Sequence, residues 1–346
     1  MTSQKIKTVL IEDSGLMRIL LSDILRSDPN IKLLSTAMNG KEGVEKVKQL
    51  KPDVVITDMV MPQFDGLHVV KQLMQHHQVP IILLSSLEKR DPKIFDALSA
   101  GAFEFINKEQ VVALAKEGHF PLNELVKTAS ESKGSSLNSG KVRKNTNAHS
   151  FAKELPYQII AIGASTGGPA AIETIIKQLP ANLMIPVVIV QHMTEQFLPS
   201  FAQRLNKLSP LHIKLAERNE TLEGGTIYIA PGHTNMKVVK NAITTKPIIT
   251  FTSKTFKEFN FPSADCLLSS VAEVYRSKAI GVILTGMGKD GTEGLQEICR
   301  HGGYTIVQDE SSSVVFGMPK SAIEAGAVKQ VVKLHEIGGF LMSCLS

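Results

Sequence analysis

The stretch Gly163-Ala164-Ser165-Thr166-Gly167-Gly168-Pro169 follows an apolar run at residues 159–162 and precedes an apolar-periodic run at residues 170–179. The first run predicts a buried strand and the second a helix, with a tight glycine-rich turn between them. Backbone N–H groups at a helix N-terminus point outward and carry partial positive charge. The turn therefore suits either of two functions: it binds a phosphate group, or it presents Ser165 as a nucleophile beside an oxyanion hole.

Two further apolar runs end in polar residues of the kinds that a serine nucleophile needs. Residues 186–190 lead into His192, and residues 279–284 lead into a glycine-rich run that contains Asp290. Because the carboxyl ends of parallel strands share one edge of a sheet, we expect both side chains near Ser165. His192 would take the serine proton, and Asp290 would hold the imidazole. The structural alternative for Ser165 is a helix N-cap, and His233 is the rival histidine, expected in a loop that lines the site.

Three other function classes fit the second half of the chain less well. The order Ser165, His192, Asp290 departs from the Ser–acid–His order of ordinary lipases and esterases. A phosphate-binding module would need the Lys-Ser/Thr end of a P-loop or the G-x-G-x-x-G spacing, and both are missing from the turn. A transcription regulator would need a helix-turn-helix with a basic face, which the strand-rich pattern does not indicate.

The first half of the chain alternates five strand-like runs with helix-like segments, which predicts a parallel sheet covered by helices. Polar residues follow four of these runs and are expected at one sheet edge: Glu12, Asp13, Asp58, Ser85 and Lys108. Three carboxylates would repel one another without a cation, and oxygen ligands favour Mg²⁺. Such a cation also stabilises charge during phosphoryl transfer. Lys108 offers a point charge for phosphoryl oxygens, and the Ser85 hydroxyl would bond a modified Asp58.

The whole chain has the length and composition of a two-domain globular protein. Its 346 residues predict domains at 1–128 and 154–346, joined by a flexible linker at 129–153 that has few large apolar residues. The net charge of +5 comes without a basic helix, so no nucleic-acid partner is expected. No segment approaches the roughly 20 apolar residues that span a bilayer, so no membrane insertion is expected. Three widely spaced cysteines predict reduced thiols and a cytoplasmic protein; we expect a monomer.

The first half resembles the receiver domain of response regulators over about residues 5–125. The resemblance rests on Glu12-Asp13, Asp58 with Met61-Pro62 after it, Asp65-Gly66, Ser85 and Lys108. It implies a flavodoxin-like (βα)5 fold in which Asp58 accepts a phosphoryl group from a phosphohistidine of a sensor kinase. It further implies that Glu12, Asp13, Asp58 and the carbonyl of Val60 hold Mg²⁺. Phe105 matches the aromatic position that moves with Ser85 on activation, whereas Glu109 stands where receivers usually have proline.

The second half resembles the chemotaxis protein-glutamate methylesterases from about residue 158 onward. The matching segments are residues 163–169, 191–193, 228–232, 284–291 and 316–319. The resemblance implies a three-layer, doubly wound α/β domain with a mostly parallel sheet. It also implies hydrolysis of glutamate γ-methyl esters, and deamidation of glutamines, on methyl-accepting chemotaxis receptors. Both reactions pass through a tetrahedral intermediate without a cofactor, and the amides of Thr166 and Met287 are the expected oxyanion donors. Phe261 stands where the family often has a basic residue.

A receiver tethered to a hydrolase implies regulation by phosphorylation. A phosphoryl group adds about −1.5 to −2 charges at Asp58 at neutral pH. The resemblance implies that the unmodified receiver covers the esterase site and that phosphorylation by the chemotaxis histidine kinase opens it. It also implies a cytoplasmic enzyme recruited to receptor arrays at the inner membrane.

Overall fold

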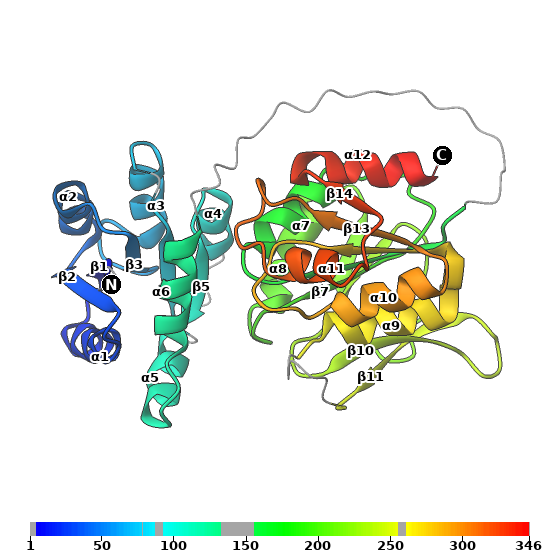
Figure 1. Ribbon diagram of the computed structural model, residues 1–346, viewed down its shortest axis with the longest axis horizontal. Coiled ribbons are helices and arrows are strands. Elements are labelled where there is room, and N and C mark those ends of the chain that lie inside the picture. The colour runs from blue at the N-terminus through cyan, green and yellow to red at the C-terminus, as the bar shows by residue number, and fades with distance from the viewer. Residues whose placement is uncertain (1–4, 78, 87–92, 133–155, 255–260, 346) are drawn as a thin grey trace. The chain divides into compact units, whose positions relative to one another are not determined.

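The computed structural model describes residues 5–77, 79–86, 93–132, 156–254 and 261–345. The chain divides into two compact units, residues 1–136 and residues 137–346. Each unit has its own sheet (Figure 1), and the two are described separately.

The first unit is a five-stranded parallel sheet with helices between its strands. Its elements in chain order are β1 (Ile6–Ile11), α1 (Gly15–Arg26), β2 (Ile31–Ala37), α2 (Gly40–Leu50), β3 (Val54–Asp58), α3 (Gly66–Met74), β4 (Ile81–Ser85), α4 (Lys93–Ser99), β5 (Glu104–Asn107), α5 (Lys108–Lys116) and α6 (Pro121–Glu131). The strand order β2-β1-β3-β4-β5 is that of flavodoxin-like folds. The predicted (βα)5 fold is confirmed.

The strands β3 and β4 of this unit are mainly apolar because helices cover both faces of the sheet. All five residues of β3 and all five of β4 are buried, as expected for a central parallel strand. The polar exceptions lie at the carboxyl ends, where Asp58 closes β3 and Ser85 closes β4. The sheet therefore places the predicted site residues along one edge.

The last helix of the first unit, α6, continues three residues past the predicted domain end at residue 128. Its buried face includes Leu122, Val126 and Ala129, which repeat at helical spacing. Ala129 thus belongs to the packed helix and not to a solvated tether. Residues 133–153 of the predicted linker lie outside the described residues, so the linker itself stays a prediction.

The second unit is built on a seven-stranded, wholly parallel sheet and an antiparallel hairpin. Its elements are β6 (Ile159–Ala164), α7 (Gly168–Ile176), β7 (Val187–Gln191), α8 (Leu198–Leu208), β8 (His212–Leu215), β9 (Thr226–Ile229), β10 (Asn235–Lys240), β11 (Pro247–Thr252), α9 (Ala264–Tyr275), the 3-10 turn η1 (Arg276–Lys278), β12 (Ala279–Ile283), α10 (Thr292–Arg300), β13 (Tyr304–Gln308), α11 (Met318–Glu324), β14 (Gln330–Val332) and α12 (Leu334–Leu345). The strand order is β14-β13-β12-β6-β7-β9-β8, and β10 pairs with β11. The predicted doubly wound sheet is confirmed.

The order of strands in this sheet reverses beside β6. The chain runs from β6 to β7 on one side and later returns to place β12 on the other side of β6. Ligands of doubly wound sheets bind at such a reversal, outside the carboxyl ends of the strands. Helices α7 and α12 pack together on one face of the sheet, and α9 and α10 pack together on the other (Figure 1).

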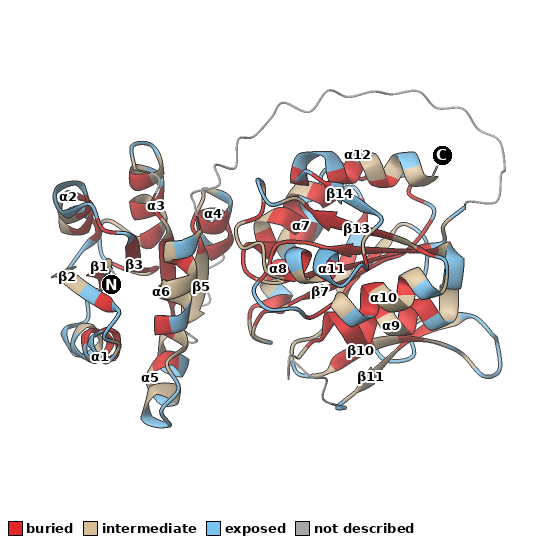
Figure 2. Ribbon diagram, in the orientation of Figure 1, coloured by how far each residue is buried: buried red, intermediate tan, exposed pale blue. Residues whose placement is uncertain are grey.

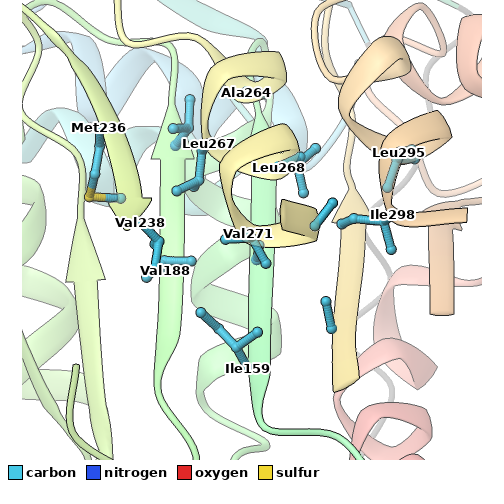
Figure 3. Close-up of a cluster of buried hydrophobic side chains, with 14 of the residues drawn as sticks. Ile159, Val188, Met236, Val238, Ala264, Leu267, Leu268, Val271, Leu295 and Ile298 are labelled. Atoms are coloured by element: carbon cyan, nitrogen blue, oxygen red, sulfur yellow. The ribbon is translucent and has the colours of Figure 1, made fainter. Parts of the chain in front are cut away.

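The core of the second unit lies between its sheet and helices α9 and α10. Figure 3 shows Leu267, Leu268 and Val271 of α9 among apolar side chains of the strands and of α10. Figure 2 shows that the central strands of the second unit are mostly buried, whereas its helices have both buried and exposed residues. Within the described residues, no helix combines the length and the apolar character needed to cross a membrane.

Candidate functional site

Ser165 lies in the turn that leaves β6 and enters α7. Within residues 159–169 every residue is buried except Ser165, which is partly exposed. Its amide donates to the carbonyl of Thr285 at 3.1 Å, and its carbonyl accepts from the amide of Gly168 at 2.7 Å. The residue that caps α7 is Gly167, in the left-handed conformation with φ 75° and no side-chain cap. The alternative in which Ser165 caps the helix is therefore wrong, and its hydroxyl is free of that structural role.

His192 and Asp290 meet at the same sheet edge. His192 follows β7, and its amide donates to the carbonyl of Ala164 at 2.9 Å, which continues the pairing with β6. The Nε2 atom of His192 lies 2.8 Å from Oδ2 of Asp290. The side chain of His192 is 15% exposed and that of Asp290 only 1%. Since Nε2 is bound to the carboxylate, Nδ1 is the ring nitrogen left for proton transfer.

The carboxylate of Asp290 lies at the N-terminus of α9. Three donors from this terminus reach it: the Ser263 hydroxyl at 2.9 Å, the Ala264 amide at 2.6 Å and the Asp265 amide at 3.0 Å. Burial by itself raises the pKa of Asp290, but the hydrogen bond from His192 and those from the amides outweigh it, so the pKa is lowered. Asp290 is thus held ionised in a buried place, where a lone carboxylate would be unstable.

A second carboxyl group lies directly beside Asp290. Asp265 is 7% exposed, and its Oδ1 accepts from the amide of Gly294 at 2.7 Å. Burial, together with the charge of Asp290, raises the pKa of Asp265 to about 7. The two neighbouring carboxyls therefore differ in protonation, because two buried like charges in contact repel each other.

The loop after β12 passes against the nucleophile turn. A Cβ added to Gly286 would lie 2.7 Å from Cβ of Ser165, so only glycine permits this approach. The Thr285 hydroxyl donates to the carbonyl of Thr166 at 2.9 Å. Met287 follows with 49% exposure. Because the Ser165 amide is already bonded to Thr285, the amides of Thr166 and Met287 stay the predicted oxyanion donors.

In the first unit, acidic residues and one lysine meet at the carboxyl ends of the strands. Lys108 Nζ lies 2.8 Å from Oδ2 of Asp58 and 3.2 Å from Oε2 of Glu12. Glu12 and Asp58 are buried, whereas Asp13 is exposed. Burial and the nearby charge of Asp58 raise the pKa of Glu12 to about 7, and burial also raises the pKa of Asp58. This pocket holds more negative charge than one lysine neutralises.

The same three carboxylates fit a divalent cation. Each of Glu12, Asp13 and Asp58 offers an oxygen, and these atoms all lie within 4.8 Å of one another. Hard oxygen donors in a partly exposed cluster suit Mg²⁺, which keeps several waters when bound. The raised pKa values of Glu12 and Asp58 show that their ionised forms are disfavoured in this cluster. A bound cation would favour those ionised forms, which is an electrostatic reason for the cluster to bind one.

The other residues predicted for the first unit lie on β4, β5 and the start of α5. Ser85 is 3% exposed, and its hydroxyl has no hydrogen-bond partner in the part of the chain that the structure describes. Phe105 lies on β5, which pairs with the strand of Ser85. Lys108 begins α5, and Glu109 falls in the first turn of that helix, where a negative charge is favourable. The replacement of proline by Glu109 thus leaves a regular helix start.

The comparisons with known proteins match both units to known families. Residues 160–341 match the CheB methylesterase family, and residues 8–116 match the response regulator receiver domain. A protein-glutamate methylesterase/protein-glutamine glutaminase of Carboxydothermus hydrogenoformans is 38% identical over 96% of this chain and 97% of its own length. One of the same name from Oceanobacillus iheyensis is 36% identical over 99% of this chain and 100% of its own.

The chain belongs to the CheB methylesterase family.

A solved structure supports this membership. The CheB methylesterase catalytic domain of Thermotoga maritima is 41% identical, with a TM-score of 0.52, and covers 54% of this chain and 98% of its own. The resemblance inferred from the sequence motifs is therefore confirmed for both halves. The chain is a CheB-family methylesterase with a receiver domain at residues 8–116.

Sequence reasoning did not find several residues that build the CheB-family site. Ser263 and Asp265, at the start of α9, contact Asp290 although they precede it by 27 and 25 residues in the chain, and no motif places them there. Thr285 bonds both Ser165 and Thr166, whereas the sequence marks it only as part of the matching segment 284–291. The rival histidine, His233, pairs instead with Glu195 at 3.0 Å on exposed loops.

Proposed function

We propose that this protein is a phosphorylation-activated protein-glutamate methylesterase and protein-glutamine deamidase that acts on methyl-accepting chemotaxis receptors. The observation that carries the proposal is that Ser165, His192 and Asp290 follow the adjacent strands β6, β7 and β12. Relatives that match nearly the whole chain bear the name of this activity.

The reaction proposed for the second unit is acyl transfer through a serine ester. His192 Nδ1 takes the proton of the Ser165 hydroxyl as its oxygen attacks the γ-carbonyl carbon of a methylated glutamate. The intermediate expels methanol, which receives that proton, and an acyl-serine ester is left. Water, deprotonated by His192, then releases the glutamate carboxylate and restores Ser165. A glutamine follows the same route with ammonia as the leaving group.

Groups near the site would stabilise the positive and the negative charge that develop in this reaction. Imidazolium formed on His192 lies against the ionised Asp290 at 2.8 Å. The oxyanion would accept from the amides of Thr166 and Met287, in the turn at the α7 N-terminus and in the loop packed against it. Loss of one such donor in a related mechanism slows catalysis about 10²- to 10³-fold.

The function proposed for the first unit is phosphoryl acceptance by Asp58 from the chemotaxis histidine kinase. Glu12, Asp13, Asp58 and the Val60 carbonyl would hold Mg²⁺, which supplies charge neutralisation when it is bound. Lys108 lies 2.8 Å from Asp58 and would bind a phosphoryl oxygen.

The unpartnered hydroxyl of Ser85 is a donor suited to the same phosphoryl group. Phe105 would move with Ser85 when Asp58 is modified. These two residues would carry the change in charge at Asp58 to the surface of the receiver.

Regulation follows if the unmodified receiver covers the esterase site and phosphorylation releases it. In this proposal a catalytic domain at 154–346 is tethered by the part of the predicted linker that follows α6, so that the domains part without separating. The protein would act as a cytoplasmic monomer recruited to receptor arrays at the inner membrane.

The test measures demethylation of purified, methylated receptor by mass spectrometry, with and without a small-molecule phosphoryl donor. We expect the donor to stimulate the full chain but not Asp58→Asn, and Ser165→Ala to be folded and inactive with or without it. Ser311→Ala, which alters a surface serine bonded to Asp309, serves as the matched control. Undiminished hydrolysis by Ser165→Ala would remove the proposed nucleophile, and equal activity of phosphorylated and unphosphorylated protein would remove the regulation.

A further inference from the structure

Gln191 ends β7 as a buried amide in an otherwise apolar strand. The four residues before it are Val, Val, Ile and Val, and Gln191 itself is 1% exposed. An apolar side chain would fill such a position without a polar group to satisfy. The presence of an amide therefore calls for specific hydrogen-bond partners.

The partners of the Gln191 amide are the carbonyls of the proposed nucleophile and the proposed base. Its Nε2 donates to the carbonyl of Ser165 at 3.0 Å and to the carbonyl of His192 at 3.0 Å. The assignment of nitrogen to this position is required by chemistry, because a carbonyl oxygen there would face two acceptors with no proton between them. Both N–H bonds of one side chain thus join the two segments that bear the reacting groups.

The carbonyl oxygen of the Gln191 side chain indicates that the two donated hydrogen bonds explain why an amide occupies this buried position. Among the described residues, Gln191 Oε1 has no hydrogen-bond partner. It lies against the start of α7, where a Cβ added to Gly168 would come within 2.1 Å of it. An unpaired buried acceptor costs free energy. The two donated hydrogen bonds offset the cost of the unpaired Oε1.

The two carbonyls lie where the strand pairing stops. In the β6–β7 ladder the last pair is Ala164 with Gln191, followed by the bond from the His192 amide to Ala164. Beyond it the chain turns into α7 after Ser165 and enters a loop after His192. The Gln191 amide ties these diverging segments together at the residues that must act on each other.

We propose that Gln191 is a positioning residue, which sets the placement of Ser165 relative to His192 through its side-chain amide. This inference rests on the proposed roles of Ser165 and His192. Gln191 touches neither the substrate nor the reacting atoms, so its loss slows the chemical step and leaves substrate binding unchanged. Misplacement of reacting groups by about 1 Å reduces a rate by on the order of 10²-fold.

The test compares Gln191→Met with Val190→Ala in the full chain, using methylated receptor as substrate and phosphoryl donor at saturation. Methionine keeps the length of the side chain and removes both donors. Val190→Ala removes two methyl groups from the preceding, fully buried residue of the same strand and leaves the amide in place. We expect kcat of Gln191→Met to fall about 10- to 100-fold with KM within about twofold. Val190→Ala should melt at a lower temperature with kcat within about twofold of the unmutated protein.

A second variant, Gln191→Glu, keeps the size of the side chain and replaces the donors by an oxygen, so its kcat should fall at least as far. A folded Gln191→Met or Gln191→Glu protein with unchanged kcat overturns the proposal. So does a kcat loss in Val190→Ala equal to that in Gln191→Met, which would assign the effect to strand stability. Ser165→Ala distinguishes failure of the proposed function from failure of the positioning role. If Ser165→Ala stays active, the proposed function fails. If Ser165→Ala is inactive and Gln191→Met is fully active, only the positioning role fails.

Discussion

The carboxylate of Asp290 accepts a 2.6 Å hydrogen bond from the amide of Ala264, the first residue of α9. A helix N-terminus carries partial positive charge and unpaired N–H groups, so it stabilises an anion there. The residue that faces the proposed base is therefore held charged and in place by a helix that contributes no reacting group.

Asp290→Asn should reduce kcat about 10³- to 10⁴-fold, with little change in KM, because the amide carries no charge to stabilise an imidazolium on His192, and its NH₂ group would replace one of two oxygens that each accept two hydrogen bonds. Steady-state demethylation measures the effect, and circular dichroism checks the fold. Asp28→Asn is the matched control, since Asp28 bonds Asn30 and Lys127 in the first unit. Wild-type kcat in Asp290→Asn would contradict the role of Asp290.

Ser263→Ala should lower the free energy of unfolding by about 1–2 kcal/mol, because Ser263 both caps α9 and donates to Asp290. Three donors to Asp290 remain, so kcat should fall less than about tenfold. Urea unfolding and initial rates measure the two effects. Ser14→Ala removes the cap of α1 in the other unit and should affect stability alone; equal kcat losses in both variants would contradict the prediction.

The raised pKa of Asp265 predicts that the free energy of unfolding depends on pH. Its pKa is raised from 3.8 to about 7 in the folded protein, so between those pH values the folded state binds more protons than the unfolded state. The free energy of unfolding contributed by this group therefore falls as the pH rises from about 4 to about 7. Asp265→Asn should remove that fall.

The measurement is urea unfolding of the full chain and of Asp265→Asn at several pH values. The difference between the two curves isolates Asp265, because the raised pKa of Glu12 is common to both proteins. We expect the variant to gain stability relative to the wild type as the pH rises. Curves that stay parallel across the window would show that Asp265 titrates alike in both states.

Lys108→Met should destabilise the first unit by about 3 kcal/mol, because it leaves the buried Asp58 and Glu12 without their cation. Mg²⁺ should restore part of the loss, since a ligand that binds only the folded state stabilises it. Thermal melts in EDTA and in excess Mg²⁺ measure both effects. Lys127→Met, which breaks a partly exposed pair with Asp28, should lose about 1 kcal/mol, regardless of Mg²⁺. An equal loss in EDTA and in Mg²⁺ for Lys108→Met would argue against cation binding.

The sequence predicted the residues that follow central strands, for a geometric reason. Parallel strands end at one edge, so His192 could be placed beside Asp290 from apolar runs alone, and the 2.8 Å contact between them fits that expectation. The same reasoning placed Lys108 beside Asp58. A strand that is buried on both faces of a sheet needs a continuous apolar run, so such strands can be predicted from the sequence.

The surroundings of Asp290 could not be predicted in this way. Ser263 and Asp265 reach it because α9 packs across β6 and β7, and that placement depends on the fit of many side chains. The bonds made by Gln191 were missed for a different reason: its side chain contacts main-chain carbonyls, which leave no trace in residue type. Short elements such as β8 and β14 carry too few residues for a clear period.

The position of β6 in its sheet also determines how much of the chain must be synthesised before the site can form. Ile159 of β6 pairs with Ala279 of β12, the strand that leads to Asp290. Joining segments so far apart in the chain carries a large loop-closure entropy, so this pairing forms late. A nascent chain that has not yet emerged beyond β12 exposes an unpaired edge of β6 and lacks the loop that packs against Ser165. The ribosome must therefore synthesise the catalytic unit at least as far as Asp290 before the site can form.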